Sequence, residues 1–216
     1  MIGCMDREVD ALLKAALGQL GYSHLRKRTF KAPWSSEVVD HLVYLDWLKN
    51  GGEHVYVLIG IRHQDAQEFA QDMLFKFGPS YSRASWKIGN NFSLVGFQLG
   101  VLCSWPLPFA LYPAEVGVDA CAGTIIDSLQ DTLRPLVEGI NDDSSMYDFL
   151  TQTEIRAMRP LNGAVHAAEV LFIGRRLGYS QHKVASDIEP FLPTITSQID
   201  QTMTVEDYLA QVWAHA

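Results

Sequence analysis

The chain has 216 residues, of which 48% are hydrophobic, and its formal net charge at pH 7 is -8. This length allows a large buried core, and the three cysteines (Cys4, Cys103 and Cys121) lack the paired close spacing of a zinc site or a disulfide framework. The longest apolar stretch, 92–105, is interrupted by serine and glutamine and is shorter than the roughly 20 residues of a membrane span. The N-terminus carries Asp6, Glu8 and Asp10 and does not look like a signal peptide, so we expect a cytoplasmic protein without a membrane segment.

The charge is unevenly distributed along the chain. Residues 1–112 contain 11 Lys/Arg and 10 Asp/Glu, whereas residues 113–216 contain 6 and 15. An acidic half repels nucleic acid and favours a basic protein partner. The alternative interpretation is that the excess charge only keeps the protein soluble.

The first part of the chain has the periodicity of a helix followed by a β-meander. Apolar residues at helical spacing predict a helix over 5–20, which Gly21 ends, and the next predicted elements are strands and a second helix. The strands are predicted at 24–31, 38–48 and 55–61, with a turn at 33–36, a hairpin at 50–52 and a helix at 64–77.

The rest of the chain becomes helical after one more strand. The predicted elements are a loop at 81–91, a buried strand at 92–103, a long helix at 113–140 kinked by Pro135, a linker at 141–145, and helices at 146–158, 163–177, 181–191 and 205–215. Strands followed by helices, without βαβ alternation, predict an α+β fold. In this fold residues 1–112 form an N-terminal helix and an antiparallel β-meander sheet. Residues 113–216 form a helical region that packs with the sheet as one domain.

Histidines near the predicted strands are the candidates for catalysis. His41, His54 and His63 are close in sequence to three carboxylates that could orient a general base, namely Asp40, Asp46 and Asp65. No spacing enforces such a pair, and the sequence contains no nucleophile elbow, zinc helix, Walker loop or dinucleotide turn. We therefore expect no catalytic residue, no metal and no cofactor. The alternative is a small-molecule enzyme with a histidine and carboxylate cleft between sheet and helices.

A basic group next to aromatic residues is the candidate for nucleic-acid binding. Arg26, Lys27, Arg28 and Lys31 are close in sequence to Tyr22, Phe30 and Trp34. Such surfaces bind single strands, but four charges are a small footprint and the acidic half opposes a polyanion. The preferred interpretation is a solvated strand face, and no nucleic-acid partner is expected.

A group of carboxylates is the candidate for binding a protein. It spans the end of the long predicted helix and the following linker, and comprises Asp127, Asp131, Glu138, Asp142, Asp143 and Asp148. The group lacks the alternating oxygen spacing of a calcium loop. Complementary charge accelerates association and rejects wrong partners, so we interpret the group as a docking surface for a basic protein.

Short motifs in the first third of the chain carry a resemblance to a family. They are Gly21-Tyr22, Arg26-Lys27-Arg28-Thr29-Phe30, the 38–48 strand, and the 56–61 strand ending in Ile59-Gly60-Ile61. Together they resemble a bacterial domain-of-unknown-function family whose members begin with a helix, a Lys/Arg-rich strand and a meander. The chain departs from this family at Leu45-Asp46-Trp47-Leu48-Lys49, where members often have an Asn-x-Gln-Lys-Ser-like run.

The resemblance implies a function in toxin neutralisation. Proteins of this kind resemble cytoplasmic immunity proteins of polymorphic toxin systems, which bind and block a cognate toxin domain. By this resemblance the chain occludes the toxin's active or substrate-binding surface without catalysis, using the acidic residues and the aromatic residues Trp34, Tyr81 and Trp86. A structural or regulatory helical adaptor is a third interpretation, and the sequence leaves the oligomeric state open.

Overall fold

The structure is a computed structural model, and it describes residues 5–48, 54–78, 95–105, 110–152, 163–195, 199–200 and 202–216. Its contacts divide the chain into two compact units. Unit 1 comprises Met1–Ser35, Asp40–Gly60 and Phe97–Gly139, and unit 2 comprises Ser36–Val39, Ile61–Gly96 and Ile140–Ala216. The boundary expected after residue 112 lies inside unit 1. The loop expected at 81–91, with Tyr81 and Trp86, lies outside the described residues.

Unit 1 begins with the predicted helix. Helix α1 (Met5–Gln19) buries Val9, Leu13 and Leu17, which recur every four residues and therefore share one face. Gly21 follows it with a φ of +84°, a left-handed conformation that glycine adopts without strain, and this ends the helix as expected.

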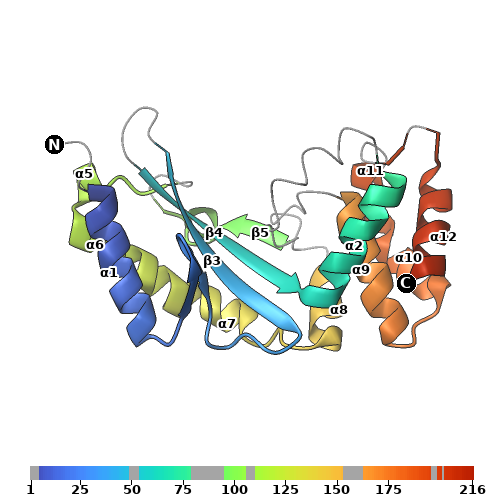
Figure 1. Cartoon of the computed structure of the whole chain (residues 1–216), viewed down its shortest axis with the longest axis horizontal. Helices are drawn as coiled ribbons and strands as arrows, with labels where there is room; N and C mark the ends of the chain where they lie inside the picture. Colours follow the sequence, from blue (N-terminus) through green and yellow to red (C-terminus); the bar gives the residue numbers. More distant parts are fainter. Residues whose placement is uncertain are drawn as a thin grey trace. The chain divides into compact units, whose positions relative to one another are not determined.

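The sheet has five strands in the order β1-β2-β3-β4-β5, so neighbours in sequence are neighbours in space (Figure 1). They are β1 (Ser23–Arg26), β2 (Thr29–Lys31), β3 (Val39–Leu48), β4 (His54–His63) and β5 (Val95–Gln98). The first two pairs, β1 with β2 and β2 with β3, are antiparallel. The single strand expected over 24–31 is therefore wrong: the chain turns at Lys27, whose φ is +44°, and forms two strands.

The remaining helices of unit 1 differ from the sequence prediction at two places. The strand expected over 92–103 is wrong in its second half, because β5 ends at Gln98 and helix α4 (Leu99–Leu102) follows. The helix expected over 113–140 consists of four pieces: α5 (Pro113–Val116), α6 (Val118–Asp127), the π-helical turn η1 (Ser128–Leu133) and α7 (Arg134–Val137). Gly117, with a φ of +90°, separates the first two pieces. Pro135 has no N–H for an α-helical bond, and the π turn directly precedes it.

Unit 2 is a helical assembly around one central helix, α9 (Gly163–Arg176), which is buried on all sides along most of its length. The helices that contact α9 are α2 (Gln64–Phe77), α8 (Asp143–Thr151), α10 (Gln181–Ile188), α11 (Leu192–Ile195) and α12 (Val205–His215), with a short 3-10 turn, Glu189–Phe191, between α10 and α11 (Figure 1). A Cβ atom on Gly174 would lie 2.6 Å from Val184 and 2.9 Å from Tyr147. This glycine therefore allows the close approach of α9 to its neighbours.

The described elements confirm the α+β class, with an N-terminal helix, an antiparallel sheet and a helical C-terminal half. The helices expected at 64–77, 163–177 and 205–215 are also present, within a residue at each end. The helix expected over 146–158 begins earlier, at Asp143, and the described part ends at Thr151. Among the helices that the structure describes, none is both long enough and apolar enough to cross a membrane.

Candidate functional site

His63 lies at the junction of β4 and α2, where both of its ring nitrogens have hydrogen-bond partners. Its ring is completely buried, and Nε2 lies 2.8 Å from the Asp143 carboxylate. The other ring nitrogen, Nδ1, accepts a hydrogen bond from the Ala66 backbone N–H at 3.2 Å. Because Nδ1 is an acceptor, the proton is on Nε2, which donates to Asp143. Arg176 pairs with the same carboxylate at 3.0 Å.

This arrangement contains a histidine and carboxylate pair but leaves no ring nitrogen open to a substrate. His63 is the N-cap of α2, where its side chain satisfies a backbone N–H that the helix itself cannot pair. Arg176 also pairs with Asp65 at 2.7 Å, so the network joins β4, α2, α8 and α9 within unit 2. The geometry is that of a structural network. It also shows that the partner of His63 is Asp143, a residue outside the expected set.

The other two candidate histidines lie in unit 1 and pack against aromatic rings. His54 is buried, stacks on Tyr112 with ring centroids 4.9 Å apart, and lies with Nε2 3.2 Å from the Tyr56 hydroxyl. His41 is 2% exposed and meets Trp34 edge to face at 6.4 Å. Their positions are those of core residues. The enzyme and adaptor interpretations stay predictions of the sequence.

The expected basic surface is partly used within the chain. Arg28 pairs with Asp10 at 2.6 Å, and the same carboxylate accepts a hydrogen bond from the Trp47 indole at 3.0 Å. Lys31 pairs with the buried Asp40 at 2.6 Å. These contacts attach α1 to the sheet and neutralise a buried charge within it.

The six expected acidic residues are divided between the two units, so the structure does not bring them together in one unit. In unit 2, Asp142 caps α8 through Ser145, and Asp143 belongs to the His63 network. Asp148 is exposed on α8. In unit 1, Glu138 pairs with Arg134 at 2.7 Å, while Asp127 and Asp131 are exposed. The charges of Asp142, Asp143 and Glu138 are thus already engaged by neighbours.

Unit 1 nevertheless has a continuous segment rich in exposed carboxylates. Four of them, which we name the acidic ridge, are Glu115, Asp119, Asp127 and Asp131, carried by α5, α6 and η1. Within the described part of the chain none of the four has an ion-pair partner. Two apolar side chains near these carboxylates in sequence are also exposed, Val116 on α5 by 49% and Leu136 on α7 by 56%. Across the residues described, no group of three or more His, Cys, Asp or Glu side chains could hold a metal ion.

Trp34 is only half-buried, and its ring is surrounded by unit 1 side chains. The ring meets Tyr22 edge to face at a centroid distance of 5.4 Å, and the Arg134 guanidinium lies over it at 5.5 Å. Trp34 is therefore only partly accessible to a partner, and its role in binding stays a prediction. Tyr81 and Trp86 lie outside the described residues, so their role stays a prediction.

Two ionisable residues that sequence reasoning missed lie on α9. His166 is 4% exposed and Glu169 is not exposed at all, and neither side chain forms a hydrogen bond of good geometry to any described residue. Burial lowers the pKa of His166 to about 4, an effect that the nearby Leu150 backbone only partly opposes, and burial raises the pKa of Glu169 well above its ordinary value. The sequence signal that could have identified them is their position in a helix whose other residues before Arg175 are apolar on every side, since such a helix is expected to be buried.

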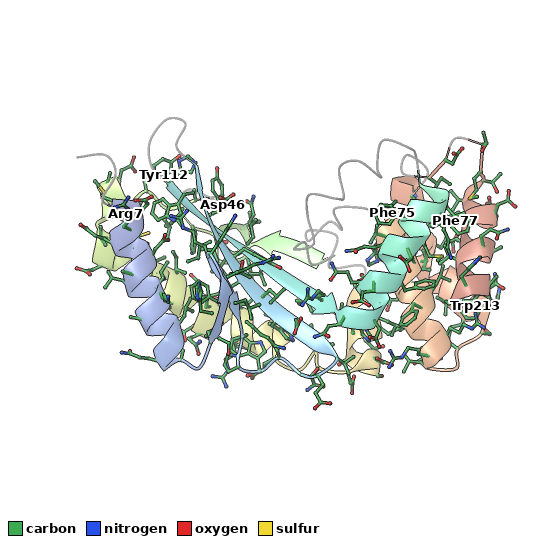
Figure 2. All side chains as sticks on the ribbon, viewed as in Figure 1. Arg7, Asp46, Phe75, Phe77, Tyr112 and Trp213 are labelled. Atoms are coloured by element: carbon green, nitrogen blue, oxygen red, sulfur yellow. The ribbon has the colours of Figure 1, made fainter. Side chains whose placement is uncertain are left out.

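Aromatic side chains also join α2 to α12 in unit 2. Figure 2 shows Phe77 on α2 and Trp213 on α12. The Phe77 ring lies 5.8 Å from His215 and 6.4 Å from Tyr208, and Arg175 donates a hydrogen bond to the Trp213 backbone carbonyl at 2.6 Å. The ring contacts attach α12 to α2, and the hydrogen bond attaches it to α9, so we interpret them as packing.

Comparison of the chain with protein-family models, curated proteins and solved structures finds no match.

Proposed function

We propose that the chain binds a basic protein domain through the acidic ridge and thereby blocks that domain, as the resemblance to immunity proteins implies. The observation that supports the proposal is the ridge itself: four exposed carboxylates on consecutive helical elements of one unit, without ion-pair partners among the described residues. Residues 113–138 contain one Lys or Arg, Arg134, which forms an ion pair with Glu138.

The charge of the acidic ridge would affect both the rate and the selectivity of binding. Exposed carboxylates of one sign create a field that attracts a positively charged surface and repels a negative one. The exposed side chains of Val116 and Leu136 supply apolar area of the kind that carries binding energy once water is excluded. Because these groups lie on helical elements, their backbone is already ordered before binding, which limits the entropy lost on association.

The test begins with a pull-down from the native host, using the tagged full chain and including the protein encoded by the neighbouring gene. The expected partner is a basic toxin-like domain that binds at a 1:1 ratio and dissociates as salt is raised from 50 to 300 mM. Its toxic activity in a purified assay should fall on addition of the chain. A partner whose activity is unchanged by saturating binding would contradict the blocking function.

A matched pair of charge reversals tests the surface. Asp127→Lys/Asp131→Lys should weaken the affinity for the isolated toxin domain at least tenfold, mainly through slower association. The control is Glu68→Lys/Asp72→Lys, which reverses two exposed carboxylates with the same spacing on α2 of unit 2. Equal weakening by both variants would assign the effect to net charge and remove the ridge as the binding surface.

A further inference from the structure

We propose that Tyr22, Trp34 and Arg134 of unit 1 form a binding site for a small oxyanion such as a carboxylate. This site is separate from the acidic ridge and does not depend on the proposed function. The site combines two buried hydrogen-bond donors, for which the described residues provide no acceptor, with a guanidinium beside them.

The two buried donors belong to one aromatic pair. The Tyr22 hydroxyl and the Trp34 indole nitrogen are both inaccessible to solvent, and neither has a hydrogen-bond partner among the described residues. The rings of Tyr22 and Trp34 meet at right angles with centroids 5.4 Å apart. An indole N–H can only donate, so its partner must be an acceptor atom. A buried donor without a partner is costly because it has lost its water and gained nothing in exchange. Since no described residue supplies the acceptor, the two groups call for a water or an ion.

Arg134 determines which acceptor suits the site. Its guanidinium lies 5.5 Å from the centre of the Trp34 ring, and its positive charge acts on the Tyr22 hydroxyl, partly opposing the rise in that group's pKa that burial causes. Tyr22 is therefore neutral and retains its donor proton. Two neutral donors and a cation are complementary to a negatively charged oxygen, and the planar guanidinium matches a carboxylate or a phosphate.

Burial decreases from Tyr22 toward Arg134, which gives the site an inner and an outer end. Tyr22 is 5% exposed, Trp34 is half-buried, and the Arg134 side chain is 50% exposed. A ligand would enter from the arginine side. Arg134 Nε is occupied by Glu138 at 2.7 Å, so this carboxylate competes with an incoming anion. The terminal guanidinium nitrogens of Arg134 have no hydrogen-bond partner among the described residues.

The indole N–H signals in a two-dimensional ¹H–¹⁵N spectrum of the full chain provide the test. Acetate and phosphate are titrated separately at constant ionic strength, with chloride as reference, and the Trp34 signal is assigned from Trp34→Phe. Trp47 and Trp105 are internal controls because their indoles already donate, to Asp10 and to Ser128, each at 3.0 Å. The expected result is a saturable shift of the Trp34 signal alone. The probe that binds with the higher affinity identifies the class of oxyanion.

Three variants assign the shift to the site. Tyr22→Phe removes only the hydroxyl and should weaken binding about tenfold, and Arg134→Gln should abolish it. Glu138→Gln removes the competing carboxylate and should tighten binding. If the Trp34 signal moves no more than that of Trp105 with either probe, or if its shift is the same in all three variants, the proposal is wrong.

Discussion

At the residue scale, the least usual feature is two buried ionisable side chains in the core of unit 2. His166 and Glu169 are one helical turn apart on α9, and both are buried. Burial keeps the imidazole unprotonated and the carboxyl group protonated, so both are neutral inside the folded protein. Folding therefore takes up or releases protons at these two residues, and stability depends on pH.

His166→Leu should remove a loss of stability that the natural chain shows in acid. The pKa of His166 is about 4 in the folded protein and 6.5 in the unfolded chain. Between these pH values the unfolded chain binds more protons than the folded protein does. The free energy of unfolding of the natural protein therefore falls as pH decreases from 6.5 to 4, by roughly 3 kcal/mol in total. Urea unfolding at pH 7 and pH 4.5 measures this difference. An unchanged pH dependence in the variant would contradict it.

Glu169→Gln should have the opposite dependence on pH. The folded pKa of Glu169 lies above its unfolded value of 4.5, so the group's contribution to stability is complete below pH 4.5 and is lost as pH rises toward the folded pKa. Glutamine does not titrate, and the variant should be more stable than the natural chain at pH 7, with the difference vanishing near pH 4. The same unfolding series measures it, and a variant that is less stable at pH 7 would refute the assignment.

At the element scale, caps and chain breaks decide where helices begin and end. Asp142 and Ser145 form a capping box at the start of α8, with the Ser145 backbone N–H donating to Asp142 at 2.8 Å. In α5 and α6 the break is a backbone conformation, because Gly117 has a φ that other residues adopt only with strain.

Asp142→Ala should lower the free energy of unfolding by about 1 kcal/mol at pH 7. The hydrogen bonds from Ser145 lower the pKa of Asp142, so its contribution is present above the ordinary value of 3.8 and is lost as pH falls further. Asp148→Ala, an exposed change on the same helix, is the control and should alter stability by less than about 0.5 kcal/mol. Denaturant midpoints at pH 7 compare the two, and equal effects would exclude a capping role.

Two glycine substitutions near the acidic ridge should change stability in opposite directions. Gly117→Ala forces a side chain into a left-handed conformation and should cost about 1–2 kcal/mol. Gly123→Ala lies in the exposed interior of α6, where an added Cβ meets nothing within 4 Å, and should stabilise by about 0.5–1 kcal/mol. Thermal unfolding of both variants tests this, and destabilisation by Gly123→Ala would contradict it.

At the scale of the whole molecule, each compact unit is assembled from separate stretches of chain. Unit 1 combines the first sheet strands with α5, α6 and α7, and α6 contacts α1. The buried face of α6 and η1 includes Cys121, Ile125, Leu129 and Leu133, which are 0–2% exposed. A boundary after residue 112 would remove this part of the unit 1 core.

A fragment of residues 1–112 should therefore fail to fold by itself. Without α6 and η1, apolar residues of α1 such as Leu13 and Leu17 lose part of their burial, at a cost of about 25 cal/mol per Å² of exposed apolar area. The expected result is weak near-ultraviolet circular dichroism and no cooperative unfolding transition, compared with the full chain. A cooperative transition in the fragment would place a domain boundary at residue 112 after all.

The sequence by itself determined the class of the fold and most of its regular elements, because periodicity and caps act over short distances. The helix spacing of α1, α2 and α9, the hydrophobic β3 and β4, and the Thr204 cap of α12 are all local signals. The sequence also showed that the excess of Asp and Glu lies in residues 113–216. Only the tertiary structure decided which charged side chains pair with each other, since Asp143 and His63 are 80 residues apart in sequence. It also decided that α5 to α7 belong to the unit that contains most of the sheet and not to the helical unit. Such contacts depend on how distant segments pack, which no short-range pattern encodes.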